Sequence, residues 1–109
     1  MMTTMATQLA GYQRAHLKRQ AHALEPVVTV GKHANSEAVQ KHLNQELVNH
    51  ELIKVRFTDH KEHRHQLARE LCEMSGAELV TIIGHVAILY RPNADPEHQR
   101  IVVPQRGPR

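Results

Sequence analysis

The sequence has few of the residues that build disulfide-linked or aromatic-cored proteins. It contains one cysteine, no tryptophan, two tyrosines and one phenylalanine among 109 residues. A single cysteine excludes an internal disulfide and is typical of a reducing compartment. Because aromatic residues are scarce, aliphatic side chains must supply most of the core. A chain of this length can bury one core but not two, so we expect a single domain.

Long apolar runs are also absent. No stretch approaches the roughly 20 residues that cross a bilayer. The first residues, MMTTMATQLAGYQR, lack the charged start and apolar centre of a secretory signal. We therefore expect a soluble, cytoplasmic protein that has no membrane partner.

Positive charge gathers at the two ends of the chain. The net charge is +3 with neutral histidines, yet residues 1–24 contain three cations and no acid, and residues 91–109 contain four arginines against two acids. A biased basic charge is typical of a surface that binds a polyanion, most commonly nucleic acid. A solubilising surface is the alternative, and composition does not separate the two.

Hydrophobic periodicity and turn residues predict the order helix, strand, helix, strand, helix, strand, strand. Helices are expected over residues 8–24, from a cap at Asn35 or Ser36 to about His50, and over residues 60–75. Strands are expected over residues 27–30, 52–58, 77–83 and 86–90, the last two as a hairpin and the first two in parallel. The predicted fold class is α/β, a compact four-stranded mixed sheet covered by helices. Residues 8–92 form the expected domain, and residues 93–109 a basic, largely irregular tail.

The first two strands differ in pattern. Residues 27–30 are almost wholly apolar, which is typical of a strand buried on both faces at the centre of a sheet. In the second strand Ile53, Val55 and Phe57 alternate with Lys54 and Arg56. One face of this strand is therefore expected to be core and the other to carry two cations.

Motifs for catalysis or metal binding are weak. The densest group of histidines is His60, His63 and His65, but His65 lies well round a helix from the other two, and no cysteine or carboxylate completes a zinc-type set. Cys72 falls on the apolar stripe of a helix, as expected for a core residue. We predict no enzyme activity, no metal, no cofactor and no small-molecule substrate.

The turn after the first strand is the strongest candidate for a binding site. It joins a strand to a helix N-terminus, where backbone N–H groups without helical partners can hold a phosphate. Basic side chains are expected around it, so the predicted site consists of Arg14, Lys18, Arg19, His22, Gly31, Lys32, His33, Ala34, Lys41, Lys54 and Arg56. With few aromatic side chains to stack on bases, we expect recognition of the backbone and shape of a nucleic acid more than of its sequence. A protein-interaction module is the alternative.

Three segments resemble the CRM domain in its stand-alone bacterial form, the YhbY-like proteins. They are R-x-H-L-K-x-x-A-H-x-L-x-P-V-V-x-V-G from Arg14 to Gly31, H-E-L-I-K-V-R from His50 to Arg56, and I-G-x-x-x-I-L-Y-R-P from Ile83 to Pro92. The resemblance covers nearly all of the chain outside its termini. It implies an RNA-binding domain similar to the C-terminal domain of translation initiation factor three.

The resemblance also implies a partner and a role. Stand-alone bacterial members of the family are associated with precursors of the large (50S) ribosomal subunit, which implies binding to ribosomal RNA and assistance in ribosome assembly. The loop after the first strand is G-x-x-G in the family, and here Ala34 stands at the last position. Alanine lacks the access of glycine to positive φ, so this loop departs from the family pattern. An adaptor that docks on a ribosomal protein or an assembly factor is the alternative function.

Overall fold

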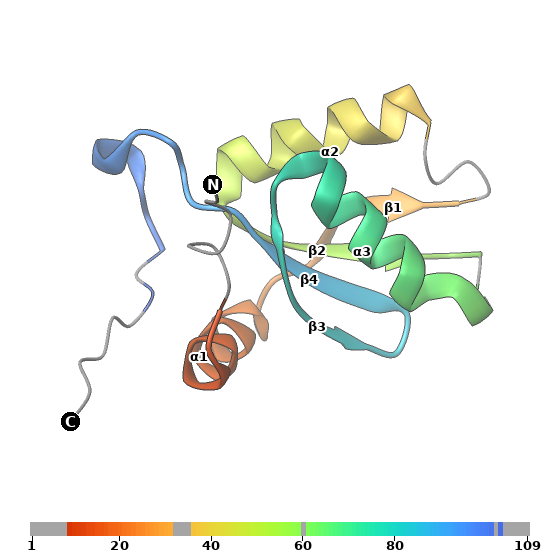
Figure 1. The fold of residues 1–109 in the computed structure, drawn as a ribbon, viewed down its shortest axis with the longest axis horizontal. Helices are drawn as coiled ribbons and strands as arrows, with labels where there is room; N and C mark the ends of the chain where they lie inside the picture. Colours follow the sequence, from red (N-terminus) through yellow and green to blue (C-terminus); the bar gives the residue numbers. More distant parts are fainter. Residues whose placement is uncertain (1–8, 32–35, 60, 102, 104–109) are drawn as a thin grey trace, which may run out of the picture.

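The computed structural model describes residues 9–31, 36–59, 61–101 and 103. Its elements follow the predicted order (Figure 1). The helices are α1 (Gly11–Ala21), α2 (Glu37–His50) and α3 (Arg64–Ser75), and the strands are β1 (Pro26–Val30), β2 (Leu52–Phe57), β3 (Glu78–Ile83) and β4 (Val86–Tyr90). Short 3-10 turns, Lys61–His63 and Pro96–His98, precede α3 and follow β4.

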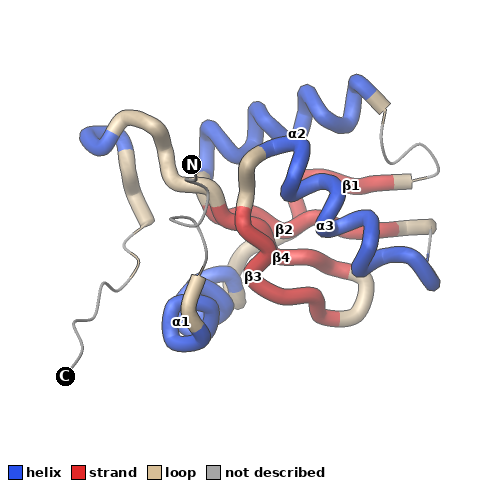
Figure 2. Tube along the Cα trace, in the orientation of Figure 1, coloured by secondary structure: helices blue, strands red, loops and turns tan. Residues whose placement is uncertain are grey.

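The four strands form one mixed sheet in the order β1-β2-β4-β3. β1 pairs with β2 in parallel, and β4 pairs antiparallel with both β2 and β3. Figure 2 shows the strands as one layer, with α2 and α3 on one face and α1 against the other. The predicted four-stranded mixed sheet covered by helices is therefore confirmed.

Local signals account for where several elements begin and end. The Ser36 hydroxyl accepts a hydrogen bond from the backbone N–H of Val39 at 3.2 Å, which caps the start of α2 as predicted. Gly76 ends α3 with a φ of 76°, and Gly84 turns the β3–β4 hairpin with a φ of 60°. Glycine adopts these positive φ values without the steric cost that other residues incur. These turns are therefore set by the residues that occupy them.

Each face of the sheet carries its own core. The larger core lies between the sheet and the pair α2 and α3, and the smaller one contains Leu17, Ala21, Leu52, Val80, Ile88 and Tyr90. On β2, Leu52 shares a face with the two cations, yet it is only 3% exposed. This face of β2 therefore carries the two predicted cations and also, at the start of the strand, a core residue, because α1 covers that end.

The predicted central position of the first strand is wrong, since β1 lies at the edge of the sheet. Val28 and Val30 are buried, whereas Val27 and Thr29 are exposed. A short valine-rich run has the same pattern whether one face of the strand or both are covered, so the pattern could not distinguish a central strand from an edge strand. The open edge is partly guarded by His42 of α2, whose Nε2 lies in hydrogen-bonding contact with the Val27 carbonyl oxygen at 3.0 Å.

Glu51 ties the residues after β4 to the domain. Its side chain is 1% exposed, and its carboxylate accepts backbone N–H bonds from Asn93 at 2.6 Å and from Arg100 and Ile101 at 2.8 Å each. Its own carbonyl accepts the N–H of Arg91 at 2.8 Å. Ile101, with Val103, then packs against the smaller core beside α1. One buried carboxylate thus anchors residues 93–101 to the domain.

Cys72 is buried on α3, as expected for a core residue. Burial, followed by the nearby charges of Glu78 and Glu73, raises the pKa of its thiol to about 12. The thiol therefore stays protonated at neutral pH, and a thiolate nucleophile is not available there. Within the described ranges, no helix is both long and apolar enough to span a membrane.

The raised pKa of Cys72 predicts a loss of stability in alkali. The unfolded chain releases this proton near pH 9.0 and the folded chain near pH 12. Stability is therefore full below pH 9 and falls as the pH rises toward 12. Between pH 8.5 and 10 the free energy of unfolding should fall by about 1 kcal/mol from this group, as measured by urea denaturation.

The matched variant is Cys72→Ala, which has no titrating group at this position. It should be less stable at pH 8.5 because packing is lost, but its stability should decline less over the same range. Equal declines in the two proteins would contradict this assignment.

Candidate nucleic-acid interface

The face of the sheet that carries α1 is only partly covered. In Figure 1, α1 lies beneath the ends of the strands near the C-terminal segment, and no described helix covers this face toward the β3–β4 hairpin. Four residues that are neighbours across the strands form a row there. Ile83 is paired with Val86, Val86 with Arg56, and Arg56 with Thr29. We call these four residues the open row.

The open row is accessible to a large ligand. Each residue of the open row has a sequence neighbour that lies in or against the larger core, namely Val28, Val55, Ile82 and Ala87. Because successive side chains of a strand point to opposite faces, the open row lies on the α1 face. Arg56 and Thr29 are exposed, Ile83 is 52% exposed and Val86 is half-buried. Among the described residues, none forms a hydrogen bond or ion pair with the exposed guanidinium of Arg56.

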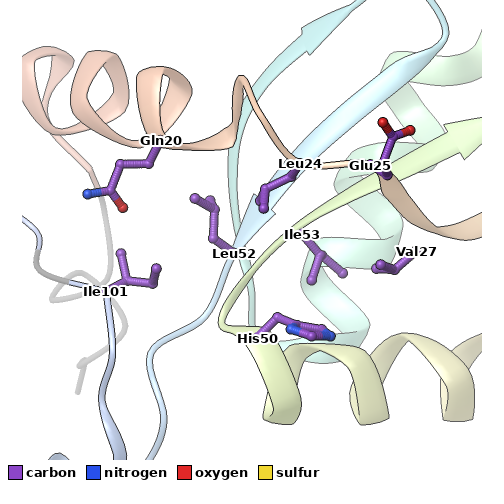
Figure 3. Close-up of a pocket in the computed structure, with 8 residues that line it drawn as sticks. All are labelled: Gln20, Leu24, Glu25, Val27, His50, Leu52, Ile53 and Ile101. Atoms are coloured by element: carbon purple, nitrogen blue, oxygen red, sulfur yellow. The ribbon is translucent and has the colours of Figure 1, made fainter.

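One flank of α1 faces the same region. Gln20 and Ile101 line one cavity, which places that flank of α1 against the C-terminal segment (Figure 3). Arg14, Lys18 and His22 follow one another at i, i+4 on the opposite flank, toward the uncovered part of the sheet. Lys18 and His22 are exposed. The flank and the open row therefore form two sides of one basic surface.

Two of the predicted cations serve the fold as well. The guanidinium of Arg14 donates to the carbonyl of Leu9 at 2.9 Å and to that of Leu79 at 3.4 Å. Lys54 donates from Nζ to the carbonyl of Leu24 at 2.9 Å, which ties the end of α1 to β2. Substitution of either residue would therefore change stability along with charge. Lys18 and Arg56 are better probes of binding.

The remaining predicted cations are dispersed. Arg19 lies about 200° round α1 from the buried Leu17, so it points to solvent away from the sheet. Lys41 is exposed on α2, on the other side of the sheet from α1. The structure thus brings Lys18, His22, Lys54 and Arg56 to one face and places Lys41 on another.

The glycine turn starts beside β2. Gly31 follows Val30, whose carbonyl accepts bonds from the backbone N–H of Thr58 at 3.0 Å and from its hydroxyl at 3.3 Å. A side-chain carbon added at Gly31 would lie 3.6 Å from the Thr58 Oγ1, an ordinary contact. Lys32, His33 and Ala34 lie outside the described residues, so their part in the site stays a prediction.

Sequence reasoning missed the uncharged members of the open row. Thr29, Val86 and Ile83 carry no binding signal of their own, and only the register across three strand pairs brings them beside Arg56. The alternation within each strand was a usable signal, since it separates the two faces. The sequence does not show which part of the α1 face of the sheet stays uncovered by the helix.

Other sites have less support. Among the described residues no group of three histidine, cysteine, aspartate or glutamate side chains is placed to hold a metal, while His60 lies outside them. The cavity in Figure 3 has a volume of about 260 Å³ and mainly aliphatic walls, with His50 and Glu25 at its margin. The exposed basic face is the feature best suited to bind a macromolecule.

Comparison with known proteins identifies several relatives. A protein from Methanocaldococcus jannaschii named "Probable RNA-binding protein" is 39% identical over 88 residues, which span 78% of this chain and 65% of that protein. One from Haemophilus influenzae named "RNA-binding protein" is 34% identical over 106 residues, 96% of this chain and 100% of the relative. A protein from Pseudomonas aeruginosa, also named "Probable RNA-binding protein", is 38% identical over 85 residues, 77% of this chain and 82% of its own length.

A solved structure and a family model also match this chain. The solution structure of a hypothetical protein from Staphylococcus aureus matches with a TM-score of 0.74 and 31% identity, and covers 89% of this chain and 100% of that one. The family model of the CRS1 / YhbY (CRM) domain matches residues 9–91. The chain therefore belongs to the CRS1/YhbY (CRM) domain family.

Proposed function

We propose that this protein binds RNA through the open row and the Lys18 flank of α1, and that the RNA is ribosomal RNA in precursors of the large subunit. The observation that carries the proposal is the exposed Arg56 side chain. It forms no hydrogen bond or ion pair with the described residues, and it lies on the same face as Lys18 and His22. Among the relatives, one is named an RNA-binding protein and two are named probable RNA-binding proteins. Binding would assist assembly of the subunit, without enzyme activity.

The chemistry of this face suits a ribose-phosphate chain. Lysine and arginine side chains supply the salt-sensitive attraction to phosphates, and arginine adds paired donors in a plane. The cations lie on two neighbouring elements, the flank of α1 and strand β2, so they can contact more than one phosphate of the same RNA. Such contacts position an RNA by shape and carry little sequence information. The Gly31 turn, with Lys32, His33 and Ala34, is proposed to extend this surface.

Co-sedimentation with ribosomal particles tests the proposal. We expect the protein to sediment with precursors of the large subunit in a lysate and to leave those fractions after nuclease treatment. Crosslinking in cells followed by sequencing of the bound RNA should recover large-subunit ribosomal RNA. A partner that resists nuclease would support the alternative, an adaptor docked on a ribosomal protein, and would count against direct RNA binding.

A further inference from the structure

We infer that the apolar end of the open row, Ile83 and Val86, receives unpaired nucleotides of the RNA, while Arg56 and Lys18 contact the adjoining phosphates. This inference rests on the proposed RNA-binding function and adds the class of RNA that the face selects. It predicts a preference for RNA in which a single-stranded segment adjoins a duplex.

The geometry of the row supports a flat contact. Its four residues lie on four adjacent strands. With strands about 4.8 Å apart, the row is about 14 Å wide. Ile83 and Val86 occupy the half near the hairpin, and Arg56 and Thr29 the half near β1. The surface thus passes from aliphatic to cationic along one line.

The hairpin that carries the aliphatic half is held in place from two sides. The Arg64 guanidinium of α3 donates a hydrogen bond to the Gly84 carbonyl. The backbone N–H of Phe57 donates to the His85 carbonyl at 2.8 Å. Ile83 and Val86 flank these two residues directly, so their positions are fixed before a ligand arrives. A preformed contact surface costs less entropy on binding.

The chemistry of RNA decides which part can meet Ile83. Phosphates and hydroxyl groups offer no favourable contact to an aliphatic side chain, and the base faces of a duplex are stacked inside the helix. Only an unpaired base can place its flat face against the sheet, beside a guanidinium that also stacks on bases. Single exposed apolar residues are common on protein surfaces, as Val48 on α2 shows with 54% exposure. The alignment of Ile83 with Arg56 distinguishes it from Val48.

The test compares two RNA probes of equal length and charge, a hairpin with an unpaired loop and a fully paired duplex. The wild type should bind the hairpin more tightly. Ile83→Thr keeps a β-branched residue in the strand and should weaken hairpin binding about fivefold, a clearly larger loss than the same variant shows on the duplex. The control Val48→Thr replaces a similarly exposed apolar side chain on the other side of the sheet. It should change neither the affinity for the hairpin nor the affinity for the duplex.

A gain of affinity provides a second test that does not depend on a destabilised variant. Ile83→Tyr enlarges the flat surface and should tighten hairpin binding about fivefold. Equal affinity of the wild type for the two probes would overturn the inference while leaving RNA binding intact, as would equal losses on both probes in Ile83→Thr. Absence of binding to either RNA by the wild type would instead refute the proposed function itself.

Discussion

The double variant Lys18→Gln/Arg56→Gln is expected to bind RNA about 30-fold more weakly than the wild type at 0.1 M salt. Each phosphate contact contributes a factor of about 5 to 8 at this salt concentration, and the logarithm of affinity falls by about 0.7 to 0.9 per contact for each tenfold rise in salt. Loss of two contacts should therefore also reduce the salt slope by about 1.5. Glutamine preserves much of the side-chain length, so charge is the main change. Titration of labelled RNA at several salt concentrations measures both quantities.

The matched control is Lys41→Gln/Arg69→Gln. Both of these side chains are exposed, and both lie on helices that cover the other face of the sheet. The net charge changes by the same amount, so any general effect of charge on RNA attraction appears equally in the two double variants. The control should retain most of the affinity. Equal losses would mean that attraction is diffuse and that the α1 face has no special role.

The largest effect on stability is expected for Glu51→Ala. This substitution leaves the partly buried backbone N–H groups of Asn93, Arg100 and Ile101 without their acceptor. A buried donor without a partner costs about 1 to 3 kcal/mol. Since the C-terminal segment can partly move into solvent, we expect a total loss of about 3 kcal/mol in the free energy of unfolding. The melting temperature should fall by more than about 10 °C, as calorimetry or thermal circular dichroism can measure.

Two further variants separate the carboxylate from its charge. Glu51→Gln keeps one oxygen that can accept the bonds from Arg100 and Ile101, so its loss should be about 1 kcal/mol. Glu97→Ala removes an exposed carboxylate from the same segment and should cost less than about 0.5 kcal/mol. Burial and, second, the charge of Glu51 raise the pKa of Tyr90, so that pKa should fall in Glu51→Gln. A Glu51→Ala protein as stable as Glu97→Ala would refute the anchoring role.

Features that depend on nearby residues were predicted well from the sequence. The order of elements, the Ser36 cap, the end of the third helix at residue 75 and the hairpin of the last two strands follow from chemistry within a few positions. The alternation of β2 also assigned Ile53, Val55 and Phe57 to one core. Each of these signals is local, so no knowledge of the rest of the fold was needed.

Features that depend on distant pairing were not predictable in the same way. Strand order decides that β1 is an edge strand, and the pattern of four residues contains no information on strand order. The placement of α1 on the second face decides that Leu52 is buried while Arg56 is exposed. Glu51 was missed as an anchor because charged residues are almost never fully buried, and its partners lie more than 40 residues away. For the site, the sequence indicated the cations but not the aliphatic half of the open row.

The contacts of α1 have a consequence for the timing of folding during translation. This helix precedes the whole sheet in the sequence, yet Leu17 and Ala21 pack in one cluster with residues from β2, β3 and β4, and with Ile101 and Val103. An isolated helix of 11 residues is marginal in water, so the nascent α1 gains a stable packing surface only when most of the chain has left the exit tunnel. The docking of α1 therefore has to follow the synthesis of β4, and the face that we propose for RNA is complete only then.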